Sequence, residues 1–199
     1  MDMTSQATED TTPGRRERKK AATRAAIATA ALTLFLERGF DAVGIREVAA
    51  QADVAVATVF KHFDSKEALL FDEDDDMAAA LILAVRERAG GVGVLDALEG
   101  WFLQTNTVSA TQSSDPSFAS FMNLVNGTPA LLGYWRARWQ QHEPALAAAI
   151  RETSSANALT AKMVAHLALD GYTYAVSSGE PGASIAVVFD LLRNGSSLG

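Results

Sequence analysis

Residues 44–67 read GIREVAAQADVAVATVFKHFDSKE and contain the pattern on which the fold prediction rests. In its first half, apolar residues recur every three or four positions, which predicts a short helix over 44–52. These residues are Ile45, Val48, Ala49 and Ala52. A second short helix is predicted from residue 55 to residue 60 or 62, after a tight connection at Asp53 and Val54. Two short helices joined by a tight turn form the pattern of a helix-turn-helix.

The segments on either side complete a small domain. Residues 15–38 carry apolar side chains at helical spacing and precede Gly39, a residue that suits the left-handed backbone at a helix end. Five apolar residues are expected to form the core that fixes the helices to one another: Val48, Ala49, Val54, Val59 and Phe63. Residues 15–66 are therefore predicted to form a three-helix domain, and the polar residues 1–14 a disordered tail.

The chain is acidic overall, with a net charge of −7 over 199 residues, but the predicted three-helix domain is basic. Residues 14–66 hold 10 Lys and Arg against 6 Asp and Glu. Because nucleic-acid binding requires a basic face rather than a basic protein, the acidic total does not exclude it. The run containing Arg15, Arg16 and Arg18 is interpreted as an electrostatic contact with DNA, and a solvated helix start is the alternative.

Residues 23–70 resemble the DNA-binding region of TetR-family regulators. The matching positions include Gly39-Phe40, Ile45-Arg46-Glu47-Val48-Ala49, Ala57-Thr58-Val59, Lys61-His62-Phe63 and Ser65-Lys66-Glu67. The resemblance implies an all-α protein, with a helix-turn-helix DNA-binding domain over 15–66 and a larger helical ligand-binding and dimerisation domain over 67–199. It also implies a homodimeric transcriptional repressor, released from palindromic half-sites of double-stranded DNA by a small-molecule effector.

Four positions depart from the family pattern. Gly44 stands where Thr usually caps the second helix, Asp53 replaces the turn glycine, Ala55 replaces a capping Ser, and Phe60 replaces a Tyr. Asp tolerates the left-handed backbone, and the lost hydroxyls weaken individual phosphate contacts. With few polar side chains on the second helix, shape and backbone contacts are expected to carry much of the affinity. The resemblance and the basic run together predict DNA contacts at Arg15, Arg16, Arg18, Arg46, Ala55, Val56, Ala57, Thr58, Phe60, Lys61, His62 and Lys66.

Beyond the motif, the periodicity predicts only helices, over 66–89, 94–109, 116–126, 129–152, 157–178 and 181–193. The acidic run 72–76 is interpreted as a solvated stretch that faces away from DNA. Apolar faces on the last two helices are expected to be covered by a second copy of the chain. The residues assigned to these faces are Ala161, Val164, Ala165, Ala168, Leu169, Ala175 and Val176 on one helix, and Ile185, Val188, Phe189 and Leu192 on the other.

Aromatic residues gather in the middle of this second region, which holds all three tryptophans. Such side chains suit either an ordinary core or a pocket for a mainly apolar effector with a few polar contacts. The residues expected to line that pocket are Trp101, Phe102, Phe118, Phe121, Met122, Tyr134, Trp135, Trp139, His142 and His166.

Several classes of function are disfavoured. The chain has no cysteine, which excludes a disulfide scaffold and cysteine-ligated zinc and indicates the cytoplasm. No apolar run is long enough to span a bilayer, so no membrane partner is expected. The three histidines are scattered and no phosphate-binding loop is present, so no catalytic residue, metal or cofactor is predicted. Two alternatives stay open: a small-molecule-binding protein of the same fold with weak or lost DNA binding, and a helical enzyme.

Overall fold

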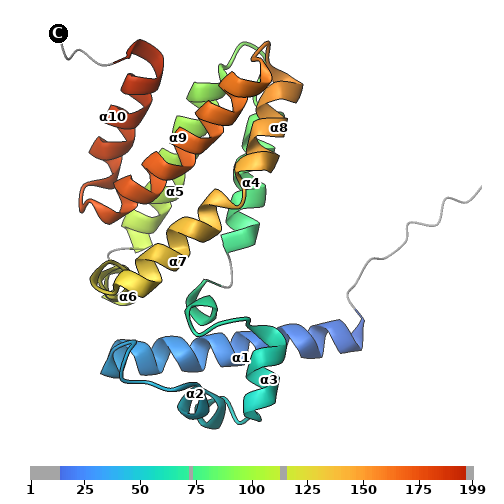
Figure 1. Cartoon of the computed structure of the whole chain (residues 1–199), viewed down its shortest axis with the longest axis vertical. Helices are drawn as coiled ribbons and strands as arrows, with labels where there is room; N and C mark the ends of the chain where they lie inside the picture. Colours follow the sequence, from blue (N-terminus) through green and yellow to red (C-terminus); the bar gives the residue numbers. More distant parts are fainter. Residues whose placement is uncertain (1–13, 72–73, 113–115, 196–199) are drawn as a thin grey trace, which may run out of the picture.

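The computed structural model describes residues 14–71, 74–112 and 116–195, with the side chains of 74, 106–112 and 116–119 left out of the description. Within these ranges every regular element is a helix, as the predicted all-α class requires (Figure 1). The elements are α1 Arg15–Arg38, α2 Ile45–Gln51, α3 Val56–His62, η1 Glu67–Leu70, α4 Asp74–Arg86, α5 Val94–Gln112, α6 Pro116–Gly127, α7 Pro129–Gln140, α8 Glu143–Thr153, α9 Ala158–Ser177 and α10 Pro181–Asn194.

Helices α1, α2 and α3 form a small unit below the main bundle, with α3 lying across α1 (Figure 1). Ile27 and Phe35 of α1 are fully buried against the predicted core. The prediction for that core is confirmed at Val48, Ala49, Val59 and Phe63, all buried, whereas Val54 is half-buried.

Local backbone chemistry sets the turns of this unit. Gly39 has a φ of 85° and its N–H donates to the Phe35 carbonyl at 2.9 Å, which ends α1. Asp53 takes the left-handed backbone with a φ of 51°, as predicted for the position between the two short helices. The N–H of Val54 then donates to the Ala49 carbonyl at 2.9 Å, so the turn closes back on α2.

The predicted helix over 66–89 is wrong, because the structure divides it into η1 and α4. Ser65 accepts a hydrogen bond from the Ala68 N–H at 3.2 Å, which starts the short η1. Phe71 then ends it, with its side chain buried against the aromatic rings of Phe121 and Tyr134. The chain thus leaves η1 at Phe71, where the side chain is buried between helices instead of continuing the helix.

The predicted helix over 129–152 is also wrong, because α7 ends at Gln140 and α8 begins at Glu143. His142 is the N-cap residue and Pro144 lies in the first turn of α8, where its missing N–H is not needed. Proline inside a helix removes a hydrogen bond, so Pro144 was the signal for this boundary.

The upper bundle packs α10 on α9 and α5, and α8 on α9 and α4 (Figure 1). Gly171 of α9 allows an especially close approach, since a Cβ there would lie 2.5 Å from a methyl carbon of Val188 on α10. The faces assigned to a second copy are largely wrong, because most of those residues are buried within this chain: Ala161, Ala165, Ala168, Leu169, Ala175, Ile185 and Phe189. They hold α9 and α10 to the rest of the bundle.

Candidate nucleic-acid interface and the core behind it

Helix α3 carries the predicted DNA-reading residues on its outer side. Val59 turns inward, 1% exposed, and fixes the helix to the small core. Phe60 is the most exposed large apolar residue of this helix, at 55%. Thr58 and His62 are half-buried, while four further candidates are exposed: Ala55, Val56, Ala57 and Lys61. The outward surface of α3 is therefore mainly apolar, and Lys61 is its exposed charged side chain.

The start of α2 is capped by a residue that the sequence analysis did not assign. The Glu47 carboxylate accepts from the Gly44 N–H at 2.9 Å and from the Arg38 guanidinium at 2.7 Å. The hydrogen bond from Gly44, followed by that from Arg38, lowers the pKa of the Glu47 carboxyl. Glu47 thus supplies the glutamate half of a capping box, although Gly44 has no side chain to supply the other half, and Arg46 beside it is exposed. The signal in the sequence was the three-residue spacing from cap to Glu.

Lys66 has an internal contact that the sequence analysis did not foresee. Its ammonium donates to the Phe40 carbonyl at 2.5 Å and lies 4.1 Å from the centre of the Phe40 ring. It also lies 5.5 Å from the centre of the Phe35 ring. In this position Lys66 ties the end of the motif to the α1–α2 connection, and phosphate contact remains a prediction.

Arg24 was not among the predicted residues, yet it holds the C-terminal end of α3. Its guanidinium donates to the His62 carbonyl and lies 4.3 Å from the centre of the Phe63 ring. A cation at that end also matches the negative end of the helix dipole. The predicted basic residues Arg15, Arg16 and Arg18 are exposed on the first turns of α1, which extends past α3 in Figure 1.

An aromatic cluster fills the centre of the bundle. Tyr172, which the sequence analysis missed, stacks on Phe102 with ring centres 4.5 Å apart and an angle of 13°. Trp139 lies 4.8 Å from Tyr172, and Trp101 and Trp135 each lie 6.3 Å from it. Four of the predicted pocket residues therefore meet around one tyrosine from the distant α9.

The other predicted pocket residues lie elsewhere. Phe121 of α6 and Tyr134 of α7 contact Phe71 rather than the cluster, with Tyr134 stacked on Phe71 at 5.7 Å. Met122 is half-buried on α6, and the side chain of Phe118 lies outside the described residues. His166 is exposed and pairs with Glu143 at 2.7 Å. This last placement separates His166 from the cluster.

An ion pair joins the start of α4 to α7. Asp75, from the acidic run, accepts from Arg138 at 2.8 Å and lies 3.5 Å from Nε2 of His142. Burial lowers the pKa of His142, the Arg138 charge acts in the same direction, and Asp75 opposes both. His142 also meets Trp139 edge-on, with ring centres 6.5 Å apart. It therefore stands between the ion pair and the aromatic cluster.

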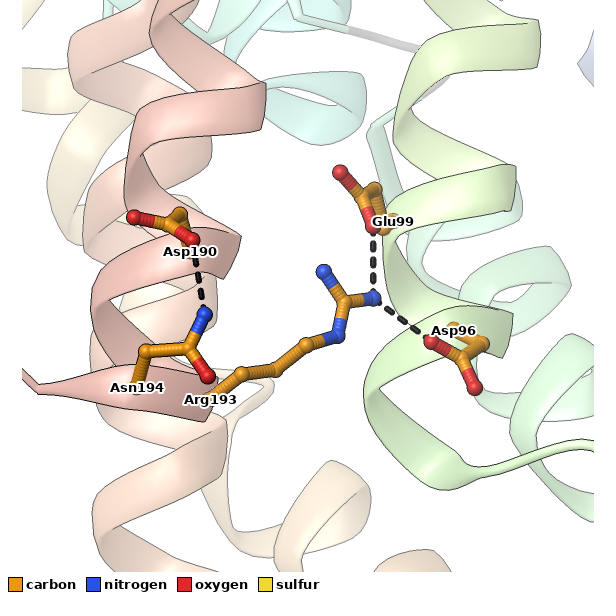
Figure 2. A network of polar contacts seen from close by, with 5 residues as sticks. All are labelled: Asp96, Glu99, Asp190, Arg193 and Asn194. Atoms are coloured by element: carbon orange, nitrogen blue, oxygen red, sulfur yellow. Dashed lines mark hydrogen bonds and ion pairs between the residues drawn. The ribbon is translucent and has the colours of Figure 1, made fainter.

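A separate cavity of about 480 Å³ lies between the start of α5, the α8–α9 connection and the end of α10. Arg193 on its edge donates to Asp96 and to Glu99, both at 2.6 Å (Figure 2). Asn194 donates to Asp190 at 2.8 Å in the same network. The two bonds of Arg193 fasten the end of α10 to α5, whereas the bond between Asn194 and Asp190 lies within α10. Among the predicted site residues whose side chains are described, none lines the cavity.

A helix-turn-helix unit joined to a helical bundle with an aromatic centre defines a class, the one-component transcriptional regulators that carry a DNA-binding and a helical regulatory domain. A family model described as bacterial regulatory proteins, tetR family, matches residues 27–72. The HTH-type transcriptional regulator TcmR of Streptomyces glaucescens is 31% identical over 139 residues, which cover 68% of this chain and 62% of TcmR. The chain belongs to the TetR family of transcriptional regulators, as the sequence resemblance predicted.

Two further comparisons extend the likeness to nearly the full chain. An HTH-type transcriptional repressor of Mycobacterium tuberculosis is 28% identical over 183 residues, covering 87% of this chain and 92% of its own length. The solved structure of Salmonella enterica GusR matches with a TM-score of 0.55 and 19% identity, over 87% of this chain and 95% of GusR. That structure shares the fold. Across the described ranges, no helix is long and apolar enough to cross a membrane.

Proposed function

We propose that this protein is a homodimeric repressor that binds palindromic double-stranded DNA in the cytoplasm and is released by a small, mainly apolar effector. The observation that carries the proposal is the contact between its two halves. Phe71 follows η1, and its buried ring packs edge-on against Phe121 and stacks on Tyr134 of the bundle. A change of conformation in the bundle would therefore act on the DNA-binding unit through this contact and shift α3.

DNA recognition would begin with α3 in the major groove. The exposed Val56 and Ala57 suit contact with thymine methyl groups, and Lys61 suits a phosphate or a base edge. Because the helix offers few polar side chains, most of the affinity would come from backbone phosphates and DNA shape. Arg46 and the basic start of α1 would supply the electrostatic part.

A second copy of the chain would bind the exposed apolar stripe on α9 and α10. The stripe consists of Leu159, Met163, Leu167, Tyr174, Val187 and Leu191, all exposed. Leu159, Met163 and Leu167 are four residues apart, so they lie on one face of α9, and Leu159 is 70% exposed. Such a row of apolar side chains is typical of a protein–protein contact. A twofold dimer would place two α3 helices about 34–36 Å apart, one turn of DNA.

Helix α7 would transmit the effector signal, because one stripe of its surface contacts the aromatic cluster and the neighbouring stripe contacts residues that follow η1. Trp135 and Trp139 enter the aromatic cluster, while Tyr134 and Arg138 contact Phe71 and Asp75. An effector that binds better to a shifted α7 would disturb these contacts and move the DNA-binding unit. In place of the continuous helix predicted over 66–89, the structure has η1, Phe71 and α4 at this junction.

The proposal is tested by binding of the full chain to its own upstream DNA over a salt series, with Lys61→Ala as the variant. Removing one phosphate contact should weaken binding to all sequences and reduce the salt slope by about 1. Arg151→Ala, an exposed cation on α8, is the matched control and should leave both quantities unchanged. Binding that is absent, or that ignores DNA sequence, would contradict the proposal.

A second candidate is a small-molecule-binding protein of the same fold that no longer reads DNA. The observation in its favour is the surface of α3, where Phe60 offers no hydroxyl and Ala55 caps the helix without a side-chain acceptor. In that case Lys61→Ala would leave the DNA affinity and its salt dependence unchanged, and ligand binding would be the activity retained.

A further inference from the structure

Helix α3 presents a patch of apolar side chains to solvent. Phe60 is 55% exposed, Val56 is 36% exposed, and Ala57 is exposed as well. Residues three and four positions apart are neighbours on a helix surface, so Phe60 lies beside both of the others. These three residues are called the apolar patch below. Neighbouring apolar side chains on a surface mark a contact with another molecule.

The apolar patch is held in place from the inner side of α3. Val59 is 1% exposed and packs into the small core, and Arg24 of α1 donates to the His62 carbonyl. The same guanidinium lies 4.3 Å from the centre of the Phe63 ring, just beyond the helix end. The backbone that carries Phe60 is therefore fixed before any partner binds, and little ordering is needed on contact.

Charge and family identify DNA as the partner of the apolar patch. The chain belongs to a family of transcriptional regulators, and residues 14–66 hold 10 Lys and Arg against 6 Asp and Glu. Lys61, the residue after Phe60, is exposed. A helix in the major groove places its cations near phosphates and its other side chains near base edges. The apolar group on those edges is the methyl group on C5 of thymine.

The apolar patch can detect this methyl group but not the polar group beside it. Thymine carries a carbonyl oxygen at C4 and cytosine an amino group, and telling them apart requires a hydrogen-bond donor or acceptor. The side chains of Phe60, Val56 and Ala57 have neither. Thr58 and His62, on the same helix, are half-buried. A cytosine that is methylated at C5 offers the patch the same methyl group at the same place as thymine.

We propose that Phe60 reads the methyl group of a 5-methylpyrimidine, so that 5-methylcytosine substitutes for thymine at its position and methylation of a cytosine there raises the affinity for DNA. This inference rests on the proposed function, since it names the base feature that the same helix recognises. It makes Phe60 a specificity-determining residue, because a phenyl ring has no hydroxyl with which to bind a phosphate.

The test begins with a footprint of the full chain on its own upstream DNA. Uracil, which lacks the methyl group, is placed at each thymine of the protected site in turn. At every sensitive position, in one half-site, four base pairs are compared: T:A, U:A, 5-methylcytosine:G and C:G. The methyl group should raise the affinity about fourfold in both kinds of pair, the effect of burying about one carbon of apolar surface. At one position or more, Phe60→Ala should bring both ratios close to one. Lys61→Ala, the matched control, should weaken binding to all four DNAs and keep both ratios.

Since removal of a methyl group also changes base stacking, the comparison of the wild-type chain with Phe60→Ala isolates the contribution of the protein. Phe60→Leu keeps an apolar side chain and should retain a methyl preference. If Phe60→Ala does not fold, Phe60→Gln carries the same expectation. Three results would overturn the inference: no thymine sensitive to uracil, a methyl effect in the A pair but not in the G pair, or ratios that Phe60→Ala leaves unchanged at every position. Absence of DNA binding refutes the repressor proposal as well, whereas sequence-dependent binding without a methyl effect refutes this inference alone.

Discussion

Substitution of Gly171 by alanine tests how tightly α9 and α10 are packed. The added Cβ would lie 2.5 and 3.0 Å from the two methyl carbons of Val188, and 3.3 Å from its Cβ. Overpacking of this kind typically costs about 1–3 kcal/mol, and the better helix propensity of alanine returns about 1 kcal/mol. The free energy of unfolding should therefore fall by up to about 2 kcal/mol, a shift of up to about 1 M in the urea midpoint.

Urea unfolding monitored by circular dichroism provides the assay, and two further variants make it specific. Gly133→Ala on α7 is the matched control, because its Cβ would meet nothing within 4 Å. That variant should gain up to about 1 kcal/mol from helix propensity alone. Adding Val188→Ala to Gly171→Ala should recover stability, with a coupling energy of at least about 1 kcal/mol. If Gly171→Ala instead stabilises the protein as Gly133→Ala does, the close approach of α9 and α10 is refuted.

Three more predictions concern other parts of the molecule. Lys66→Ala should lower the free energy of unfolding by about 1 kcal/mol in urea, because it removes the hydrogen bond to Phe40; an unchanged midpoint would contradict this. Since burial lowers the pKa of His142 below 6.5 in the folded state, the unfolded chain binds more protons there and stability falls as the pH drops through that value. Urea midpoints at pH 7.5 and 5.5 should differ less in His142→Gln, and an equal difference would count against that role. Leu167→Glu should convert the proposed dimer to monomer in light scattering, whereas Leu83→Glu, which replaces a leucine of similar exposure on α4, should not.

Local sequence determined the DNA-binding unit almost completely. The spacing of Val48, Ala49, Val59 and Phe63 fixed which faces of two short helices meet, and each of these residues is buried. Asp53 was expected in the turn that needs a left-handed residue, and it has that backbone. These predictions succeeded because contacts between residues a few positions apart follow directly from helix geometry.

The boundaries in the second half depended on contacts that the local pattern does not contain. The end of η1 depends on burial of Phe71 against α6 and α7, more than 45 residues further along the chain. Tyr172 was overlooked for a related reason, since its partners Phe102 and Trp139 come from two other helices. The break before Pro144 is different, because its signal was present in the sequence.

For α9 and α10, the sequence does not predict which apolar face is buried within the chain. Each helix carries apolar residues on two faces. The periodicity of the sequence identifies both faces but does not distinguish the face that packs inside the bundle from the one that stays exposed. The structure buries Ala161, Ala165 and Phe189 inside the bundle and leaves Leu159 and Leu167 exposed. Local sequence was therefore sufficient to predict the all-α class and the helix-turn-helix, because these depend on neighbours within a few residues. The tertiary structure decided which apolar face remains for a partner, because that depends on how distant helices pack.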